Sequence, residues 1–159
     1  MMKPDQLPFF VYGTLLPKQP NHSLYEAEIV SLEPATFSDG QLHDMGFYPM
    51  LVPAQDGIVQ GMLVTVAPES YQVVQQRLDE LEGYDPKQPD ASAYRRMRVE
   101  VLLVNGRSQK AWTYLGQIQF AQNKPIIANG DWAAHAAAKQ LELRDWWHTI
   151  HTVAGLHGK

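Results

Sequence analysis

Several stretches of the chain have the hydrophobic patterns of β-strands. Leu7–Tyr12 is apolar on both faces and rich in aromatic residues, which predicts a buried strand. Ile58–Val66 alternates between two faces and is a second strand candidate. Tyr94–Val104 and Arg107–Leu115 flank Asn105-Gly106. An Asn-Gly pair between two β-rich segments is the strongest short-range signal for a hairpin, because both residues tolerate positive φ.

Proline interrupts other segments, and their pattern is ambiguous. Ile29–Ser38 has the composition of a strand that Pro34 breaks. Asp44–Pro53 contains one glycine and two prolines and is predicted to be a loop with short extended pieces. Asn21-His22-Ser23 is a candidate cap for a short helix that begins near Leu24.

The clearest helical pattern covers Pro68–Leu81. Proline suits the first position of a helix, because its missing N–H would have no partner there. Glu69 lies in the first turn, where the helix dipole favours negative charge. Gly83 is predicted to end the helix in the left-handed conformation. Apolar residues at spacings of three and four form one stripe: Tyr71, Val74, Leu78 and Leu81.

A second helix is expected from about Asp131 to Thr149, where alanine is frequent and Asn129-Gly130-Asp131 supplies capping candidates. Several strands and two helices predict an α+β fold with a mixed or antiparallel sheet. The 11 prolines and 11 glycines are spread along the chain, and no internal repeat or low-complexity linker interrupts it. We therefore expect one domain over residues 1–159.

The composition is that of a globular protein. Of the 159 residues, 45% are hydrophobic and 19% are charged, which argues against disorder. The net charge of −4 gives no electrostatic reason to expect a nucleic acid or an acidic membrane as partner. The absence of cysteine excludes disulfides, thiolate metal ligands and a cysteine nucleophile.

Hydropathy gives no sign of a targeting segment. The apolar segment near the N-terminus, Leu7–Val11, is too short for a signal core. No later segment approaches the roughly 20 apolar residues of a membrane span. Together with the lack of cysteine, which suits a reducing compartment, this pattern leads us to expect a cytoplasmic protein.

The turn Tyr12-Gly13-Thr14-Leu15 is the first candidate for a functional site. Gly13 permits backbone conformations that bring consecutive N–H groups onto one concave face. Such a group of donors binds a carboxylate or phosphate without a side-chain charge. The alternative is an ordinary turn that ends a strand.

Glu82 is the second candidate. It follows the apolar stripe of the first helix and lies at the negative end of the helix dipole, which disfavours ionisation of a carboxylate. Partial burial would raise the pKa of Glu82 in the same direction, and a carboxylate tuned in this way can exchange protons near pH 7. The alternative is a solvated residue at a frayed helix end.

Tyr94-Arg95-Arg96 and two histidines are further candidates. Tyr94 and Arg96 either line a polar cavity or belong to an edge strand whose charges block aggregation. His148 and His151 are three residues apart on the expected second helix, but no third metal ligand has matching spacing. We therefore expect no metal and no organic cofactor.

Two separated blocks of sequence stand out together. The first is Phe9-Phe10-Val11-Tyr12-Gly13-Thr14-Leu15 with Gln19-Pro20-Asn21-His22, and the second is Leu78-Asp79-x-x-Glu82-Gly83 with Tyr94-x-Arg96. The first block resembles the opening signature, and the second the catalytic-glutamate segment, of the γ-glutamylcyclotransferase-like superfamily, and most closely of its γ-glutamylamine cyclotransferase branch. Ala111-Trp112-Thr113-Tyr114 resembles a later strand of this family, and Asn129-Gly130-Asp131-Trp132 is similar to a Gly-Asp-Trp element of its bacterial members.

The resemblance implies a compact β-barrel-like core with flanking helices, and an enzyme that cyclises a γ-glutamyl amine or peptide to 5-oxoproline by intramolecular aminolysis. It implies Glu82 as the general acid/base. The substrate-binding residues that follow from it are Tyr12, Gly13, Thr14, Leu15, Tyr94, Arg96 and Tyr114. We expect a small-molecule γ-glutamyl substrate and a monomer or weak dimer.

Substrate identity stays open, because the segment Gly83–Ala93 is longer than is usual in the family and the tail after Trp132 is longer than in its shortest members. Two other kinds of function also stay open. The same cavity would serve a sensor or carrier domain that binds a small carboxylate without turnover. Alternatively, an exposed Trp146-Trp147 would serve a protein-interaction module, although core packing of these residues is the competing interpretation.

Overall fold

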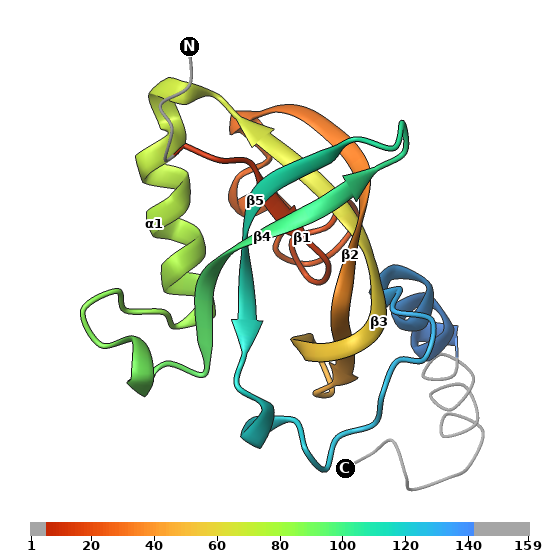
Figure 1. Ribbon diagram of the computed structural model, residues 1–159. Coiled ribbons are helices and arrows are strands. Elements are labelled where there is room, and N and C mark those ends of the chain that lie inside the picture. Colours follow the sequence, from red (N-terminus) through yellow and green to blue (C-terminus); the bar gives the residue numbers. More distant parts are fainter. Residues whose placement is uncertain (1–5, 142–159) are drawn as a thin grey trace, which may run out of the picture.

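Five β-strands close into a barrel in the computed structural model, which describes residues 6–141 (Figure 1). Around the barrel the strands follow the order β1 (Phe9–Val11), β3 (Pro49–Val66), β2 (Ile29–Asp44), β4 (Tyr94–Leu103) and β5 (Ser108–Gly116). β1 runs parallel to β5 and every other neighbouring pair is antiparallel, so the barrel is mixed. The expected α+β fold with a barrel-like core is confirmed.

The predicted first strand is confirmed as β1. Its successive side chains point to opposite faces and belong to two separate apolar clusters. Phe9 and Val11 belong to a cluster that also contains residues of the helix α1 (Tyr71–Glu82). Phe10 belongs to a second cluster, to which all five strands contribute residues, as the interior of a small closed barrel requires. Both faces of β1 are therefore buried, which explains why its sequence is apolar throughout.

Two proline-rich segments differ from their predicted structure. Pro34 does not break the strand around it: β2 is continuous, and Pro34 pairs with Met62 of β3. The other edge of β2 pairs with β4 only at Ala35 and Thr36, so the missing N–H of Pro34 disrupts little of the ladder. The loop predicted over Asp44–Pro53 is shorter than expected, because β3 begins at Pro49. Proline is tolerated at the first position of a strand.

The Asn105-Gly106 hairpin is confirmed. β4 and β5 pair antiparallel from Tyr94, opposite Gly116, to Leu102, opposite Ser108. Gly106 has φ of 87°, which is the left-handed conformation that the turn requires.

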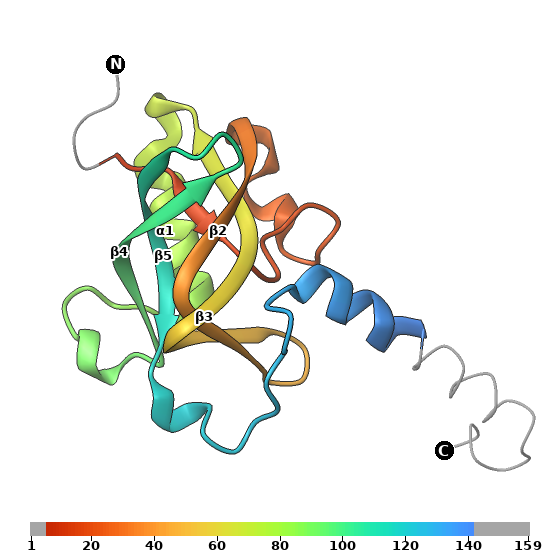
Figure 2. The same cartoon turned by 45° about the vertical axis from the view of Figure 1, so that its right-hand side comes forward.

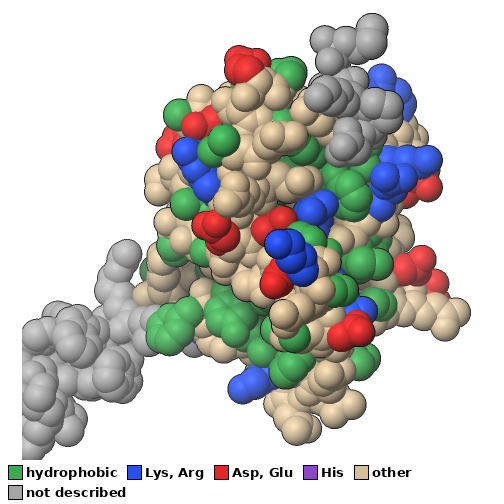
Figure 3. Space-filling model, turned by 90° about the vertical axis from the view of Figure 1, so that its left-hand side faces the viewer, with side chains coloured by type: hydrophobic (Ala, Val, Ile, Leu, Met, Phe, Trp, Pro, Cys, Tyr) green, Lys and Arg blue, Asp and Glu red, His purple; other side chains and the backbone are tan. Residues whose placement is uncertain are grey.

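α1 packs against one side of the barrel and is preceded by a 3₁₀ turn at Pro68–Ser70 (Figure 1). Gly83 ends it with φ of 68°, and its N–H donates to the carbonyls of Asp79 and Glu80, which confirms the predicted cap. The predicted stripe is wrong at its last position. Leu81 is exposed, and the buried residue of that turn is Asp79. Acidic and basic side chains are interspersed on the face of the molecule that Figure 3 shows.

A second helix covers residues 132–141 and projects from the barrel (Figure 2). The Asp131 carboxylate accepts a hydrogen bond from the N–H of Ala134 at 3.1 Å, so the predicted N-cap is confirmed. The predicted end of this helix, Trp146-Trp147 and the pair His148 and His151 lie outside the described residues. Within residues 6–141, no helix is long and apolar enough to span a bilayer.

Candidate active site

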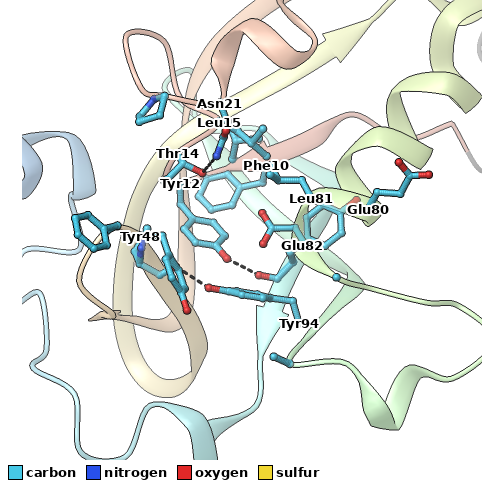
Figure 4. A pocket seen from close by; sticks show the side chains of 18 residues that line it. Phe10, Tyr12, Thr14, Leu15, Asn21, Tyr48, Glu80, Leu81, Glu82 and Tyr94 are labelled. Carbon is cyan, nitrogen blue, oxygen red and sulfur yellow. Dashed lines mark hydrogen bonds between the residues drawn. The ribbon is translucent and has the colours of Figure 1, made fainter.

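A cavity of about 590 Å³ opens where the turn after β1, the end of α1 and the start of β4 meet. It brings together seven of the eight residues that the sequence predicted for the site: Tyr12, Gly13, Thr14, Leu15, Glu82, Tyr94 and Tyr114 (Figure 4). They come from four separate parts of the chain, which only the closed barrel places around one space.

Glu82 is the last residue of α1, and its half-buried carboxylate points into this cavity (Figure 4). It lies four residues after the buried Leu78, which puts both on the same face of the helix. No residue within the described part of the chain donates a hydrogen bond to the carboxylate. Burial raises the pKa of Glu82 to about 7, because desolvation disfavours the charged form.

Three tyrosine side chains surround Glu82, and each of their hydroxyl groups donates elsewhere. The Tyr12 hydroxyl donates to the backbone carbonyl of Tyr114 at 2.6 Å, and the Tyr94 hydroxyl donates to the carbonyl of Pro49 at 2.9 Å. The Tyr114 hydroxyl donates to Oδ1 of Asp79 at 2.6 Å. Burial raises the pKa of all three phenols, and the nearby Glu82 carboxylate raises each further. All three are therefore neutral at pH 7.

The turn after β1 is held through its carbonyl groups. The Thr14 carbonyl accepts the N–H of Asn21 at 2.9 Å, and the Thr14 hydroxyl accepts the Asn21 amide group at 3.0 Å. The Leu15 carbonyl accepts the buried Tyr25 hydroxyl at 3.0 Å. Asn21 therefore anchors this turn instead of capping the helix predicted near Leu24, where the chain forms two short 3₁₀ turns, His22–Leu24 and Glu26–Glu28.

The amide groups of the same turn remain available. The N–H groups of Gly13, Thr14 and Leu15 donate to no acceptor among residues 6–141. Gly13 itself does not have positive φ. Glycine is required there for space, because a Cβ atom on Gly13 would lie 2.6 Å from Cγ of Pro49.

Arg96 is the predicted site residue that does not line the cavity. Its Nε donates to Oδ1 of Asp79 at 3.0 Å, and its guanidinium lies 4.9 Å from the ring centroid of Trp112 and 5.6 Å from that of Tyr84. Charge neutralisation and stacking therefore hold Arg96 behind the cavity wall, where it fixes Asp79. The prediction that Arg96 lines the cavity is wrong.

Asp79 is the residue that sequence reasoning missed. It is 8% exposed and accepts hydrogen bonds from both Tyr114 and Arg96. The signal in the sequence was the spacing of eight residues from Tyr71, which places Asp79 on the buried face of α1.

The mouth of the cavity carries Phe47 and Tyr48, from the connection between β2 and β3. This connection is tied to the helix 132–141. Nζ of Lys139 lies 3.1 Å from both carboxylate oxygens of Asp44 and 2.6 Å from the carbonyl of Gly46. Burial raises the pKa of the Asp44 carboxyl, but hydrogen bonds from His135, Gly46 and Lys139 outweigh burial and lower it overall.

Comparison with known proteins identifies the family. Residues 9–134 match the family model described as "Gamma-glutamyl cyclotransferase, AIG2-like", and this span contains every residue of the cavity. The chain belongs to this family. The comparison with curated proteins found no match.

Solved structures share the fold of this AIG2-like γ-glutamyl cyclotransferase family member. YkqA from Bacillus subtilis is 23% identical with a TM-score of 0.58, and the match covers 84% of this chain but 42% of YkqA. An AIG2-like protein from Mus musculus is 22% identical with a TM-score of 0.59, covering 76% of this chain and 84% of that protein. A protein from Arabidopsis thaliana is 19% identical with a TM-score of 0.60, covering 100% and 90% of the two chains.

Proposed function

We propose that this family member converts a γ-glutamyl amine or peptide to 5-oxoproline and a free amine. The α-amine of the substrate attacks its own γ-carbonyl carbon, a new C–N bond closes the five-membered lactam, and the original amide C–N bond breaks. One observation carries the proposal: a half-buried carboxylate with a raised pKa and unpaired main-chain amides line the same cavity.

Glu82 manages the protons of this reaction. The α-amine is protonated at neutral pH and attacks only after it loses a proton. A carboxylate whose pKa is about 7 accepts that proton more readily than an ordinary glutamate does, and it returns the proton to the leaving nitrogen. The proton count balances over the cycle, so the proposed reaction needs no redox partner.

The amides of Gly13, Thr14 and Leu15 bind the α-carboxylate of the substrate. Adjacent main-chain N–H groups bind an anion without a cationic side chain. The nucleophile is tethered to its target, so the principal task of the protein is to hold the substrate folded, with amine and carbonyl in contact. Tyr94 and Tyr114 line the same cavity.

The first experiment is a substrate panel assayed for 5-oxoproline and released amine in equal amounts. It contains γ-glutamyl amines, γ-glutamyl dipeptides, and two matched controls: the α-glutamyl isomers and N-acetylated γ-glutamyl amines. In the α-glutamyl isomers, attack of the α-amine on the amide carbonyl cannot close a five-membered ring. In the N-acetylated compounds the amine is blocked as a nucleophile, so neither control should react. Equal amounts of both products from an unblocked γ-glutamyl compound support the proposal.

A different outcome identifies a binding domain. Ligands that raise the melting temperature without yielding 5-oxoproline would show that the cavity binds small carboxylates and does not turn them over. That result would refute the enzymatic proposal and support a sensor or carrier. The panel also distinguishes amines from peptides as the leaving group.

A further inference from the structure

Asp79 and Glu82 lie one turn apart on α1, so their side chains are neighbours on one face of the helix. Their environments differ sharply. Oδ1 of Asp79 accepts the Tyr114 hydroxyl at 2.6 Å and Nε of Arg96 at 3.0 Å. Glu82 accepts no hydrogen bond from the residues that the structure describes.

The groups that face Glu82 come from three strands or their ends. Tyr12 follows β1, Tyr94 begins β4 and Tyr114 lies in β5, and the Glu82 charge acts on all three phenols. Glu80 and Tyr48 line the same cavity. Tyr12 and Tyr94 donate to backbone carbonyls, which no side-chain substitution removes. Tyr114 alone of the three depends on a side chain as its acceptor.

We propose that Asp79 is a positioning residue, which holds the Tyr114 hydroxyl away from Glu82 and so preserves Glu82 as a proton acceptor. A hydroxyl that donated to Glu82 would stabilise the carboxylate anion and weaken it as a base. Asp79 competes successfully for this hydroxyl because it is buried and already aligned by Arg96.

Arg96 completes the arrangement. Its side chain is 14% exposed and that of Asp79 is 12% exposed, so each charge neutralises the other away from bulk water. Cation–π contacts with the rings of Trp112 and Tyr84 also hold the guanidinium in place. The pair thus presents a fixed acceptor to the Tyr114 hydroxyl.

The test is a direct titration of the Glu82 carboxyl by NMR in protein labelled with ¹³C at glutamate, which needs no turnover. The variants are Asp79→Ala, Tyr114→Phe and the double variant. In Asp79→Ala the released hydroxyl donates to Glu82, and the pKa of Glu82 should fall by about 1 to 2. Tyr114→Phe alone should leave it near the wild-type value of about 7.

The double variant separates the effect of the Tyr114 hydroxyl on the pKa of Glu82 from the effect of losing the Asp79 side chain. Its Glu82 pKa should exceed that of Asp79→Ala by about 1 to 2, because no hydroxyl remains to donate. Equal values in Asp79→Ala and the double variant would overturn the proposal. A raised Glu82 pKa in Tyr114→Phe would also overturn it, because the hydroxyl would then already donate to Glu82 in the wild type.

Asp79→Asn keeps the test decisive if Asp79→Ala does not fold. It removes the charge but retains an acceptor oxygen, so Glu82 should titrate near its wild-type pKa. A fall in Asp79→Asn as large as the fall expected for Asp79→Ala would overturn the proposal in favour of a simple charge effect. The catalytic meaning of the arrangement rests on the proposed function, but the titration does not: absence of 5-oxoproline refutes the enzyme and leaves the titration result standing.

Discussion

The buried Glu82 carboxylate should destabilise the folded protein at neutral and alkaline pH, and Glu82→Gln should remove this cost. Burial raises the pKa of Glu82 from 4.5 to about 7. Each unit of difference between folded and unfolded pKa is worth about 1.4 kcal/mol, which gives an upper value of about 3.5 kcal/mol. Glu82 is only half-buried, and solvent screening reduces this to about 2 kcal/mol.

The sign of the pH dependence follows from proton uptake. The folded state binds the Glu82 proton more tightly than the unfolded state does, so this contribution to stability is fully present below pH 4.5. It falls as the pH rises from 4.5 to about 7 and is lost above that. Wild type and Glu82→Gln should therefore diverge across this window, with the variant the more stable protein at pH 8.

Urea unfolding at a series of pH values measures this divergence, provided the m-value is the same in both proteins. Glu80→Gln is the matched control, because it makes the same chemical change two residues earlier, on an exposed part of the same helix. Its difference from wild type should vary little with pH. A Glu82→Gln difference that is constant from pH 4.5 to 8 would refute the claim that Glu82 is buried and ionises near pH 7.

Three further predictions concern turnover. The wild-type kcat/KM should rise with an apparent pKa of about 7 on the acid side, because Glu82 must be ionised to accept a proton; a profile flat from pH 5.5 to 8 would contradict this. Gly13→Val should raise KM about 5- to 100-fold, because its side chain meets Pro49; an unchanged KM would show that this turn does not bind substrate. Lys139→Met should raise KM about 2- to 5-fold with kcat nearly unchanged, because it releases the connection between β2 and β3 at the mouth of the cavity. Lys110→Met, an exposed change on β5, is the control. An equal effect from this control would contradict the specific role of Lys139.

The parts of the fold predicted correctly are those whose local sequence agrees with their tertiary setting. The Asn105-Gly106 turn, the Gly83 cap and the Asp131 cap each depend on a few adjacent residues, and all three are confirmed. β2 could not be read locally, because Pro34 is tolerated only where the neighbouring strand pairing is sparse. Closure of the barrel determines how sparsely β2 is paired beside Pro34, and the local sequence does not indicate it.

The site was predicted through Glu82 and the turn at Gly13, which one cavity brings together. Asp79 was missed because an acid on a helix is ordinarily solvated, and its burial depends on Arg96 of β4 and Tyr114 of β5. The same contact withdraws Arg96 from the cavity. Pairing between distant side chains therefore decided which polar residues face the cavity.

The most direct test of Glu82 as the proton acceptor is the rate of 5-oxoproline formation from a γ-glutamyl amine by Glu82→Gln relative to wild type, both shown to be folded. Glutamine keeps the shape of the side chain and removes the proton acceptor, so we predict a loss of at least ~10²-fold. A variant rate within a few-fold of wild type, or no 5-oxoproline from either protein with any γ-glutamyl compound, would contradict it.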